Sequence, residues 1–175
     1  KIFCRTIRAT KKNNRKNSET VLKTIDELNI PAVWFWPNSD AGTNDVAKAI
    51  RMYREHGKLK NNKIRFVTDL LPDDFIALLK QSSALVGNSS AGIKESSYLG
   101  TPVINIGTRQ QGRLRGQNVV DAACNNEAIK KAIKAQLVHG KYPRSDIYYK
   151  LQGSRKVAEI LQKTPLYCQK KFNDL

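Results

Sequence analysis

Two serines and two arginines near the middle of the chain have the types and spacing that bind an anion. Ser89 and Ser90 lie in the small-residue turn GNSSAG at 87–92, directly after a short apolar run. Hydroxyl groups and free backbone N–H groups at the start of a helix bind phosphate, and the helix dipole favours negative charge there. Arg109 and Arg113 follow the next apolar run, and forked guanidinium groups suit a diphosphate. These residues predict a phosphate-bearing ligand.

Glu95 extends the prediction from a phosphate to a nucleotide. It lies in a helix-compatible segment about one and a half turns after Ser89, where its carboxylate can accept hydrogen bonds from two vicinal hydroxyls, as acidic residues do from ribose. The structural alternatives are plain capping by the serines, a surface carboxylate at Glu95, and a solvated third arginine, Arg115. The turn is not a Walker A loop, because no Gly-Lys-Ser/Thr follows. It is not a nucleophile elbow either, because Gly92 comes one position late.

The hydrophobic pattern that must position these residues alternates between strands and helices. Apolar runs predict strands at 1–4, 32–36, 64–68, 84–86, 102–106 and 119–120. Helical spacing predicts helices from Ser18 as N-cap to before Pro31, after the turn 38–42 as far as Gly57, from Pro72, over 126–138 and over 151–161. This alternation predicts an α/β fold with a doubly wound, Rossmann-like parallel sheet. Ligands lie outside the carboxyl ends of such strands, so the turns 38–42 and 88–92 should face one cleft.

Length and charge bound the class of protein. The 175 residues fit a single domain over 1–175, because no linker or repeat divides them. The formal net charge of +16 would attract polyanions. The basic residues are nevertheless spread along the chain without a nucleic-acid motif, so nucleic acid is not the expected partner. Their densest stretch, 5–16, is predicted to be a loop.

Membranes and metals are also not expected. No apolar run approaches the roughly 18 residues of a membrane span. Cys4, Cys124 and Cys168 are odd in number and far apart, without Cys-x-x-Cys spacing, which is typical of reduced thiols in a cytoplasmic protein. His56 and His139 are too distant in sequence to favour a zinc site. We therefore expect neither a metal nor another cofactor.

Two segments together resemble the UDP-N-acetylglucosamine 2-epimerases, namely WPNSDAG at 36–42 and the run 87–118. Within the second, GNSSAGIKE and GTPVINIGTRQ are similar almost word for word to the hydrolysing branch, which makes N-acetylmannosamine and UDP at the start of sialic acid synthesis. The later GKYP at 140–143 and SDIY at 145–148 also resemble its C-terminal region. The resemblance covers nearly the whole chain from Val33.

The resemblance implies a two-domain fold, of which this chain is one domain. The family fold has two Rossmann-like domains facing a deep cleft, as in GT-B glycosyltransferases, and this chain resembles only the C-terminal, UDP-binding domain. The N-terminal partner domain is expected to be missing from it, and the intact enzyme to be a homo-oligomer. The implied contacts to UDP are those of Asn38, the backbone near Leu70 and Leu71, Ser89, Ser90, Glu95 and Arg109, with Arg113 nearer the matching arginine of the non-hydrolysing branch.

The chemistry implied by the resemblance is an elimination followed by hydration. A base removes the proton at sugar C2, UDP leaves by anti-elimination to give 2-acetamidoglucal, and water then adds with inversion at C2. Most carboxylates for these steps belong to the N-terminal domain, so we expect this chain alone to be inactive. The family's His-Pro pair has no counterpart here. The matching stretch is FCRTIR at 3–8, and Arg5 cannot act as a base near neutral pH.

Two other functions remain open. A GT-B glycosyltransferase that uses a UDP-sugar would also place a Glu near the ribose, although TRQ at 108–110 and the turn 37–42 favour the epimerase. A non-catalytic module would bind a nucleotide sugar, or nucleic acid through the net charge. Salt-dependent DNA binding would separate that last class from specific binding of UDP.

Overall fold

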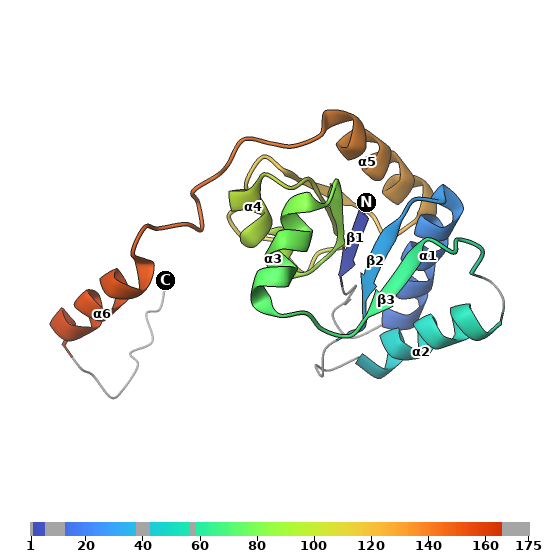
Figure 1. Ribbon diagram of the computed structural model, residues 1–175, viewed down its shortest axis with the longest axis horizontal. Helices are drawn as coiled ribbons and strands as arrows, with labels where there is room; N and C mark the ends of the chain where they lie inside the picture. The colour runs from blue at the N-terminus through green and yellow to red at the C-terminus, as the bar shows by residue number, and fades with distance from the viewer. Residues whose placement is uncertain (1, 6–12, 38–42, 57–58, 166–175) are drawn as a thin grey trace, which may run out of the picture.

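The computed structural model describes residues 2–5, 13–37, 43–56 and 59–165. They form a six-stranded parallel sheet in the order β3-β2-β1-β4-β5-β6 (Figure 1). The strands are β1 (Ile2–Arg5), β2 (Ala32–Phe35), β3 (Ile64–Val67), β4 (Ala84–Gly87), β5 (Val103–Ile106) and β6 (Val119–Ala122). The predicted fold class is therefore confirmed. Because the strand order reverses between β1 and β4, the topological switch point lies there.

Helices cover both faces of this sheet. They are α1 (Asn14–Leu28), α2 (Thr43–Glu55), α3 (Pro72–Gln81), the 3-10 turn η1 (Ser90–Gly92), α4 (Glu95–Leu99), α5 (Asn126–His139) and α6 (Gly153–Lys163). Residues of α1, α2 and α5 share one hydrophobic core with the sheet, and α3 and α4 pack against its other face. The sheet is thus the middle of three layers (Figure 1).

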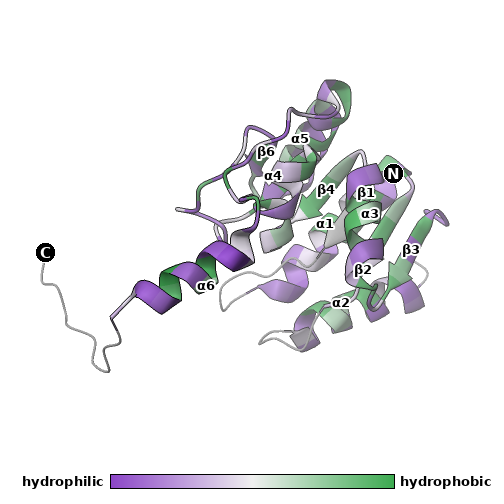
Figure 2. Ribbon diagram, turned by 60° about the vertical axis from the view of Figure 1, so that its left-hand side comes forward, coloured by the Kyte–Doolittle hydropathy of each residue, from purple (hydrophilic) through white to green (hydrophobic). Residues whose placement is uncertain are grey.

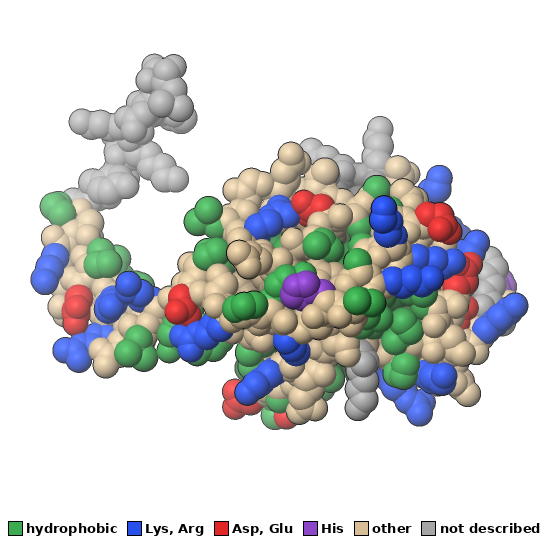
Figure 3. Space-filling model, turned by 90° about the horizontal axis from the view of Figure 1, so that it is seen from above, with side chains coloured by type: hydrophobic (Ala, Val, Ile, Leu, Met, Phe, Trp, Pro, Cys, Tyr) green, Lys and Arg blue, Asp and Glu red, His purple; other side chains and the backbone are tan. Residues whose placement is uncertain are grey.

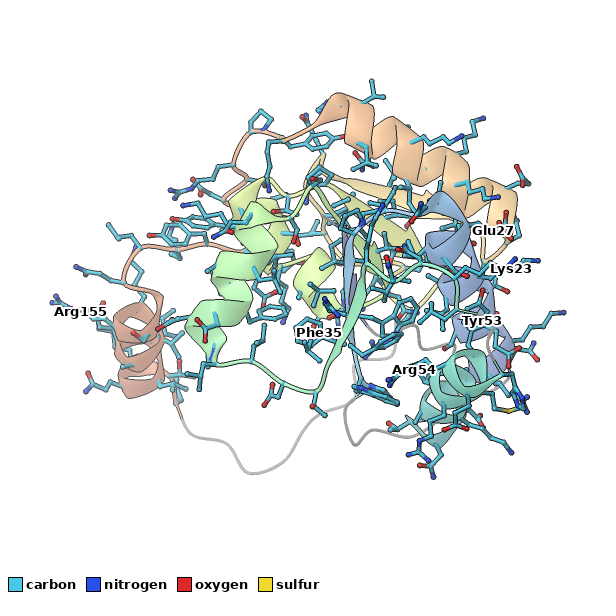
Figure 4. The ribbon with its side chains drawn as sticks, turned by 45° about the vertical axis from the view of Figure 1, so that its right-hand side comes forward. Lys23, Glu27, Phe35, Tyr53, Arg54 and Arg155 are labelled. Atoms are coloured by element: carbon cyan, nitrogen blue, oxygen red, sulfur yellow. The ribbon has the colours of Figure 1, made fainter. Side chains whose placement is uncertain are left out.

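The apolar run in β2 shows why the central strands are hydrophobic throughout. Successive side chains of a strand point to opposite faces. Trp34, only 2% exposed, belongs to the core under α1, α2 and α5, while Phe35 packs with Leu79 of α3. The Phe35 ring also meets Phe75 of α3 edge-on at 6.0 Å between centroids (Figure 4). A strand buried on both faces needs no polar alternation.

The N-terminal part of α1 differs from the prediction. The helix begins at Asn14, one turn before the expected start, and Ser18 lies buried inside it, so the assignment of Ser18 as N-cap is wrong. Residues 14–16, predicted to be loop, are helical too. Their first turn carries no apolar side chain to signal a helix, and an ion pair between Arg15 and Glu19, with N···O at 2.9 Å, supports it instead.

The chain after α5 forms a strap, defined here as residues 140–152, that runs along α3, α4 and the residues that follow these two helices. Lys141 Nζ donates to the carbonyls of Lys80 (2.8 Å) and Ser82 (3.0 Å), and burial lowers the pKa of its amine. Farther along the strap, the Arg144 guanidinium lies over the rings of Tyr98 and Tyr149, which stack on each other with centroids 4.4 Å apart. These contacts hold the strap against α3 and α4.

Beyond the strap, α6 stands apart from the sheet (Figure 1). None of its eleven residues, all described, is buried. Val157, Ile160 and Leu161 are 56%, 63% and 66% exposed, and apolar and polar residues alternate around the helix (Figure 2). An apolar side on an isolated helix is a surface that another structure normally covers.

Two global features complete the description. No helix in the described residues is long and apolar enough to cross a membrane. Viewed from above, the lysines and arginines are scattered among other side chains instead of forming one continuous stripe (Figure 3).

Candidate functional site

Four of the predicted site residues, Ser89, Ser90, Glu95 and Arg109, lie in segments that follow β4 and β5 at the carboxyl edge of the sheet. β1 and β4 end together there, with Arg5 in register with Gly87. The turn 88–92 follows β4, and the loop 107–113 follows β5, the next strand in the sheet. The fold thus brings the small-residue turn and the arginine loop side by side at the strand ends, where ligands of such sheets bind.

Gly92 explains why the turn after β4 consists of small residues. A Cβ atom added to Gly92 would lie 3.0 Å from Val103 Cγ1 and 3.3 Å from Leu85 Cδ2. The 3-10 turn η1 therefore packs its backbone closely against side chains of β4 and β5, and a larger residue at position 92 would require these side chains to shift by a few tenths of an ångström. This close approach fixes the two serines next to the strand ends.

The two serines occupy the start of that 3-10 turn. Ser89 is its N-cap, with an extended backbone, and its Oγ accepts a hydrogen bond from the Ala91 N–H at 3.3 Å. Ser89 therefore caps the turn, which was the structural alternative to phosphate binding. A capping oxygen still carries a hydroxyl hydrogen that can be donated to an anion. Ser90 is the first residue of η1 and is half-buried.

Glu95 is the first residue of α4 rather than lying one and a half turns into a helix. The segment starts as the 3-10 turn η1 and only then becomes α-helical, which changes the expected spacing. Glu95 is half-buried, and its Oε2 is shielded from solvent without a hydrogen-bond partner among the described residues. A shielded carboxylate oxygen of this kind is costly unless a donor reaches it.

Arg109 reaches across from the β5 loop to the β4 turn. Its Nη1 donates to the Asn88 carbonyl oxygen at 3.2 Å, and Gln110 Nε2 donates to the same oxygen at 2.7 Å. The Asn88 side chain returns a bond to the Ile106 carbonyl at 3.3 Å. These three bonds tie the two segments together. They place the Arg109 guanidinium beside Ser89, since that residue follows Asn88 directly.

The other two arginines behave differently. Arg113 is exposed farther along the loop, and no hydrogen bond in the described part of the chain links its side chain to the β4 turn. Arg115 is held by Asp121 of β6, with Nη1 at 2.8 Å from both carboxylate oxygens. Its Nη2 donates to the Gln110 carbonyl at 3.2 Å. Arg115 is thus neither a phosphate ligand here nor merely solvated, because it is a structural partner of β6.

Of the remaining predicted contacts, Leu70 is described by the structure and Asn38 is not. Leu70 is half-buried between β3 and α3, and its backbone N–H donates to the Asp69 carboxylate at 2.9 Å. Asn38 lies outside the described residues, as does the whole turn 38–42, so its predicted position opposite the turn 88–92 stays a prediction. The structure therefore brings Ser89, Ser90, Glu95 and Arg109 into one region, and it leaves Asn38 undescribed.

Sequence reasoning missed Asn88 and Gln110 as members of the site. Both are buried, at 2% and 1% exposure. They take part through the backbone carbonyl of Asn88, to which Gln110 donates, and such a bond cannot be recognised from residue types. The only available signal was their position beside Ser89 and Arg109. No group of three or more His, Cys, Asp or Glu residues in the described chain is arranged to hold a metal ion.

A hollow lies elsewhere on the molecule, between α1 and α2. It measures about 630 Å³ and is lined by Arg15, Lys16, Glu19, Thr20, Lys23, Asp26, Glu27, Met52, Tyr53 and Lys60. Lys23, Glu27 and Tyr53 mark it in Figure 4. Acidic and basic groups alternate there. Asp26 is already satisfied by the Tyr53 hydroxyl and by the backbone N–H groups of Lys60 and Asn61.

Comparison with known proteins connects this arrangement to one family. The model of the UDP-N-acetylglucosamine 2-epimerase family matches residues 3–162. Over 116 residues the chain is 35% identical to the GDP/UDP-N,N'-diacetylbacillosamine 2-epimerase (hydrolyzing) of Campylobacter jejuni. This alignment covers 66% of this chain and 29% of that protein. Over 151 residues it is 29% identical to the UDP-N,N'-diacetylbacillosamine 2-epimerase (hydrolyzing) of Legionella pneumophila, covering 86% and 39%.

Solved structures show the same fold. The UDP-GlcNAc 2-epimerase of Methanocaldococcus jannaschii, solved in complex with UDP-GlcNAc and UDP, superposes with a TM-score of 0.68 at 17% identity, covering 93% of this chain and 45% of that one. A UDP co-structure from S. aureus gives a TM-score of 0.64 at 16% identity, covering 93% and 44%.

These relatives are much longer than the matched region, since the chain spans between 29% and 45% of their length. The family match nevertheless runs across almost all of this chain, including the turn after β4 and the loop after β5. The chain belongs to the UDP-N-acetylglucosamine 2-epimerase family.

Proposed function

We propose that this chain is the C-terminal, UDP-binding domain of a hydrolysing UDP-N-acetylglucosamine 2-epimerase. The observation that carries the proposal is the hydrogen bond from Arg109 to the carbonyl that precedes Ser89, with Glu95 at the start of α4, the helix that follows the same turn. The family match supports it. The names of the Campylobacter and Legionella relatives support the hydrolysing reaction.

Each residue has a role in the proposed complex. The Ser89 and Ser90 hydroxyls and the Arg109 guanidinium bind the diphosphate, because donors and a fixed positive charge match its oxygens. Glu95 accepts hydrogen bonds from the ribose hydroxyls, which would supply the donor that its shielded Oε2 lacks. Arg113 remains a proposed outer contact, and Asn38 and the backbone at Leu70 are proposed contacts to the rest of the nucleotide.

In the proposed reaction this domain holds the leaving group. Loss of the C2 proton and anti-elimination of UDP would give 2-acetamidoglucal, and addition of water would release N-acetylmannosamine, a precursor of sialic acid. Holding the negative charge that develops on UDP lowers the barrier to its departure. The groups that move protons at C2 belong, in this proposal, to a second domain across the cleft.

The exposed side of α6 supports the existence of that second domain. Val157, Ile160 and Leu161 have no cover in the described chain, and the solved relatives have more than half their length outside the matched region. We infer that the partner domain packs against α6 and closes the cleft. The chain alone then binds UDP weakly and has no turnover.

A second candidate substrate follows from the relatives' names. One is named for UDP-N,N'-diacetylbacillosamine and another for GDP/UDP-N,N'-diacetylbacillosamine, and the UDP form differs from UDP-N-acetylglucosamine in the sugar and not in the nucleotide. The proposed contacts of this domain are to UDP, so both substrates suit them equally. The choice of sugar would be made by the other wall of the cleft.

Calorimetry tests the proposal directly. UDP, both UDP-sugars and uridine are titrated separately into the chain. Uridine is the control ligand, because it lacks the diphosphate. We expect UDP and the two sugars to bind with similar affinities and uridine to bind much more weakly, because the diphosphate contributes most of the binding. Equal affinity for uridine and UDP, or release of N-acetylmannosamine by this chain alone, would contradict the proposal.

A further inference from the structure

We propose that Gln110 is a positioning residue, which orients Arg109 toward the diphosphate by fixing the Asn88 carbonyl oxygen. This inference rests on the proposed function, because it assigns a task within the same site. Gln110 itself would not touch the ligand, since it is only 1% exposed. It would act through the Asn88 carbonyl.

The Asn88 carbonyl oxygen is the point where the two loops meet. It accepts from Gln110 Nε2 at 2.7 Å and from Arg109 Nη1 at 3.2 Å. The bond from Gln110 is the shorter one and comes from a buried side chain, whereas Arg109 is exposed. An exposed arginine has many rotamers of similar energy. Gln110 therefore fixes the acceptor, and the fixed acceptor limits where the guanidinium can lie.

The same bond sets the direction of a backbone donor. The Asn88–Ser89 peptide is planar and trans, so its C=O and its N–H point in opposite directions. Holding the Asn88 oxygen against the β5 loop turns the Ser89 N–H away from that loop. One hydrogen bond from Gln110 thereby fixes the peptide plane at the start of η1 and, with it, the oxygen that Arg109 binds.

The other end of Gln110 is anchored as well. Its backbone carbonyl accepts from Arg115 Nη2 at 3.2 Å, and Asp121 of β6 holds the Arg115 guanidinium at 2.8 Å. Asp121 Oδ1 also accepts from Asn105 Nδ2 of β5 at 2.7 Å. Gln110 is thus the link between a rigid strand edge, formed by β5 and β6, and the turn after β4.

A purely stabilising side chain would not have the pattern of bonds that Gln110 has. Its Oε1 is buried without a partner among the described residues, and an unpaired buried acceptor costs folding free energy. An apolar side chain of similar size would avoid that cost while losing only one bond, because the Asn88 oxygen keeps Arg109 as a donor. Gln110→Leu should therefore change stability little and ligand geometry strongly.

The test compares Gln110→Leu and Gln110→Glu with Gln111→Leu, the same change at the exposed neighbour. Calorimetry uses UDP, inorganic pyrophosphate and uridine as probes. We expect Gln110→Leu to lower the affinity for UDP and for pyrophosphate about tenfold and to leave the affinity for uridine unchanged. Gln110→Glu should lower the affinity for UDP and pyrophosphate further, because a carboxylate cannot donate to the Asn88 oxygen and repels phosphate. Gln111→Leu should match the parent chain.

A second measurement works without any ligand. In ¹H–¹⁵N spectra, Gln110→Leu should shift or broaden the Ser89 amide and the Arg109 side-chain signals, and Gln111→Leu should not. Unchanged signals, or a loss of affinity equal for uridine and UDP, would overturn the positioning role. Failure of the parent chain to bind UDP would reject the proposed function instead, and the spectra alone would then decide whether Gln110 orders the two loops.

Discussion

Replacing Glu95 with alanine should separate its role in binding from any role in folding. Glu95 Oε2 is buried without a hydrogen-bond partner among the described residues. When UDP binds, the ribose hydroxyls would donate to this carboxylate. Glu95→Ala should therefore weaken UDP and should have no effect on 2′,3′-dideoxy-UDP, which lacks both hydroxyls.

The size of the loss follows from the burial of the carboxylate. A hydrogen bond to a charged group contributes about 1.5–3 kcal/mol net, and because Oε2 is already shielded, the ligand removes little further water from it. One such bond corresponds to a loss of about 10- to 150-fold in affinity. Stability should change little. Removing an unpaired buried oxygen is favourable, whereas removing an acidic residue from the first turn of α4 is unfavourable.

Calorimetry with both nucleotides and thermal unfolding of each variant check this prediction. Glu127→Ala is the matched control, because Glu127 also lies in the first turn of a helix, α5, and is exposed. The control should bind both nucleotides like the parent chain. Equal losses for UDP and its dideoxy analogue, or a large drop in Tm for Glu95→Ala, would refute the assignment of Glu95 to the ribose.

Three further predictions concern the scaffold. Gly100→Ala should lower the free energy of unfolding by about 2–4 kcal/mol in urea denaturation, because Gly100 has φ of 63° and its added Cβ would collide with the Tyr142 carbonyl. Lys141→Met should cost about 1–2 kcal/mol by the same assay, since the ammonium bonds two carbonyls and the Thr101 hydroxyl. The hydrogen bond from Lys130 lowers the pKa of Glu27, so Lys130→Met should raise that pKa in an NMR titration. The stabilisation from Glu27 is present above its ordinary pKa and disappears as the pH falls through the lowered value. Lys130→Met should reduce this dependence without removing it, because Asn126 and Lys23 also lower the pKa of Glu27.

Helices and strands were predictable where burial produces a regular pattern. The helix expected over 126–138 is α5 (Asn126–His139), because Ile129 and Ile133 face the core at helical spacing and Asn125 caps it, accepting the Ala128 N–H at 2.8 Å. The start of α1 was not predictable in this way. Its first turn has only polar residues, and the ion pair of Arg15 supports it.

The candidate site was predictable in its residue types and not in its connections. Ser89 and Arg109 could be identified because hydroxyl and guanidinium groups have a known chemistry with phosphate. The bond that joins them ends on the backbone oxygen of Asn88, which the sequence does not distinguish from any other carbonyl. Arg115 also could not be assigned, because its partner Asp121 lies in a different element, at the exposed end of β6.

The central claim is that the carboxyl edge at the switch point binds UDP, and a ¹H–¹⁵N titration of the chain with UDP tests it most directly. We predict that the largest shifts fall on residues 88–95 and 107–113, while amides beside the hollow between α1 and α2, such as Lys23 and Lys60, stay unchanged. Shifts confined to that hollow, or no shifts at millimolar UDP, would contradict the account.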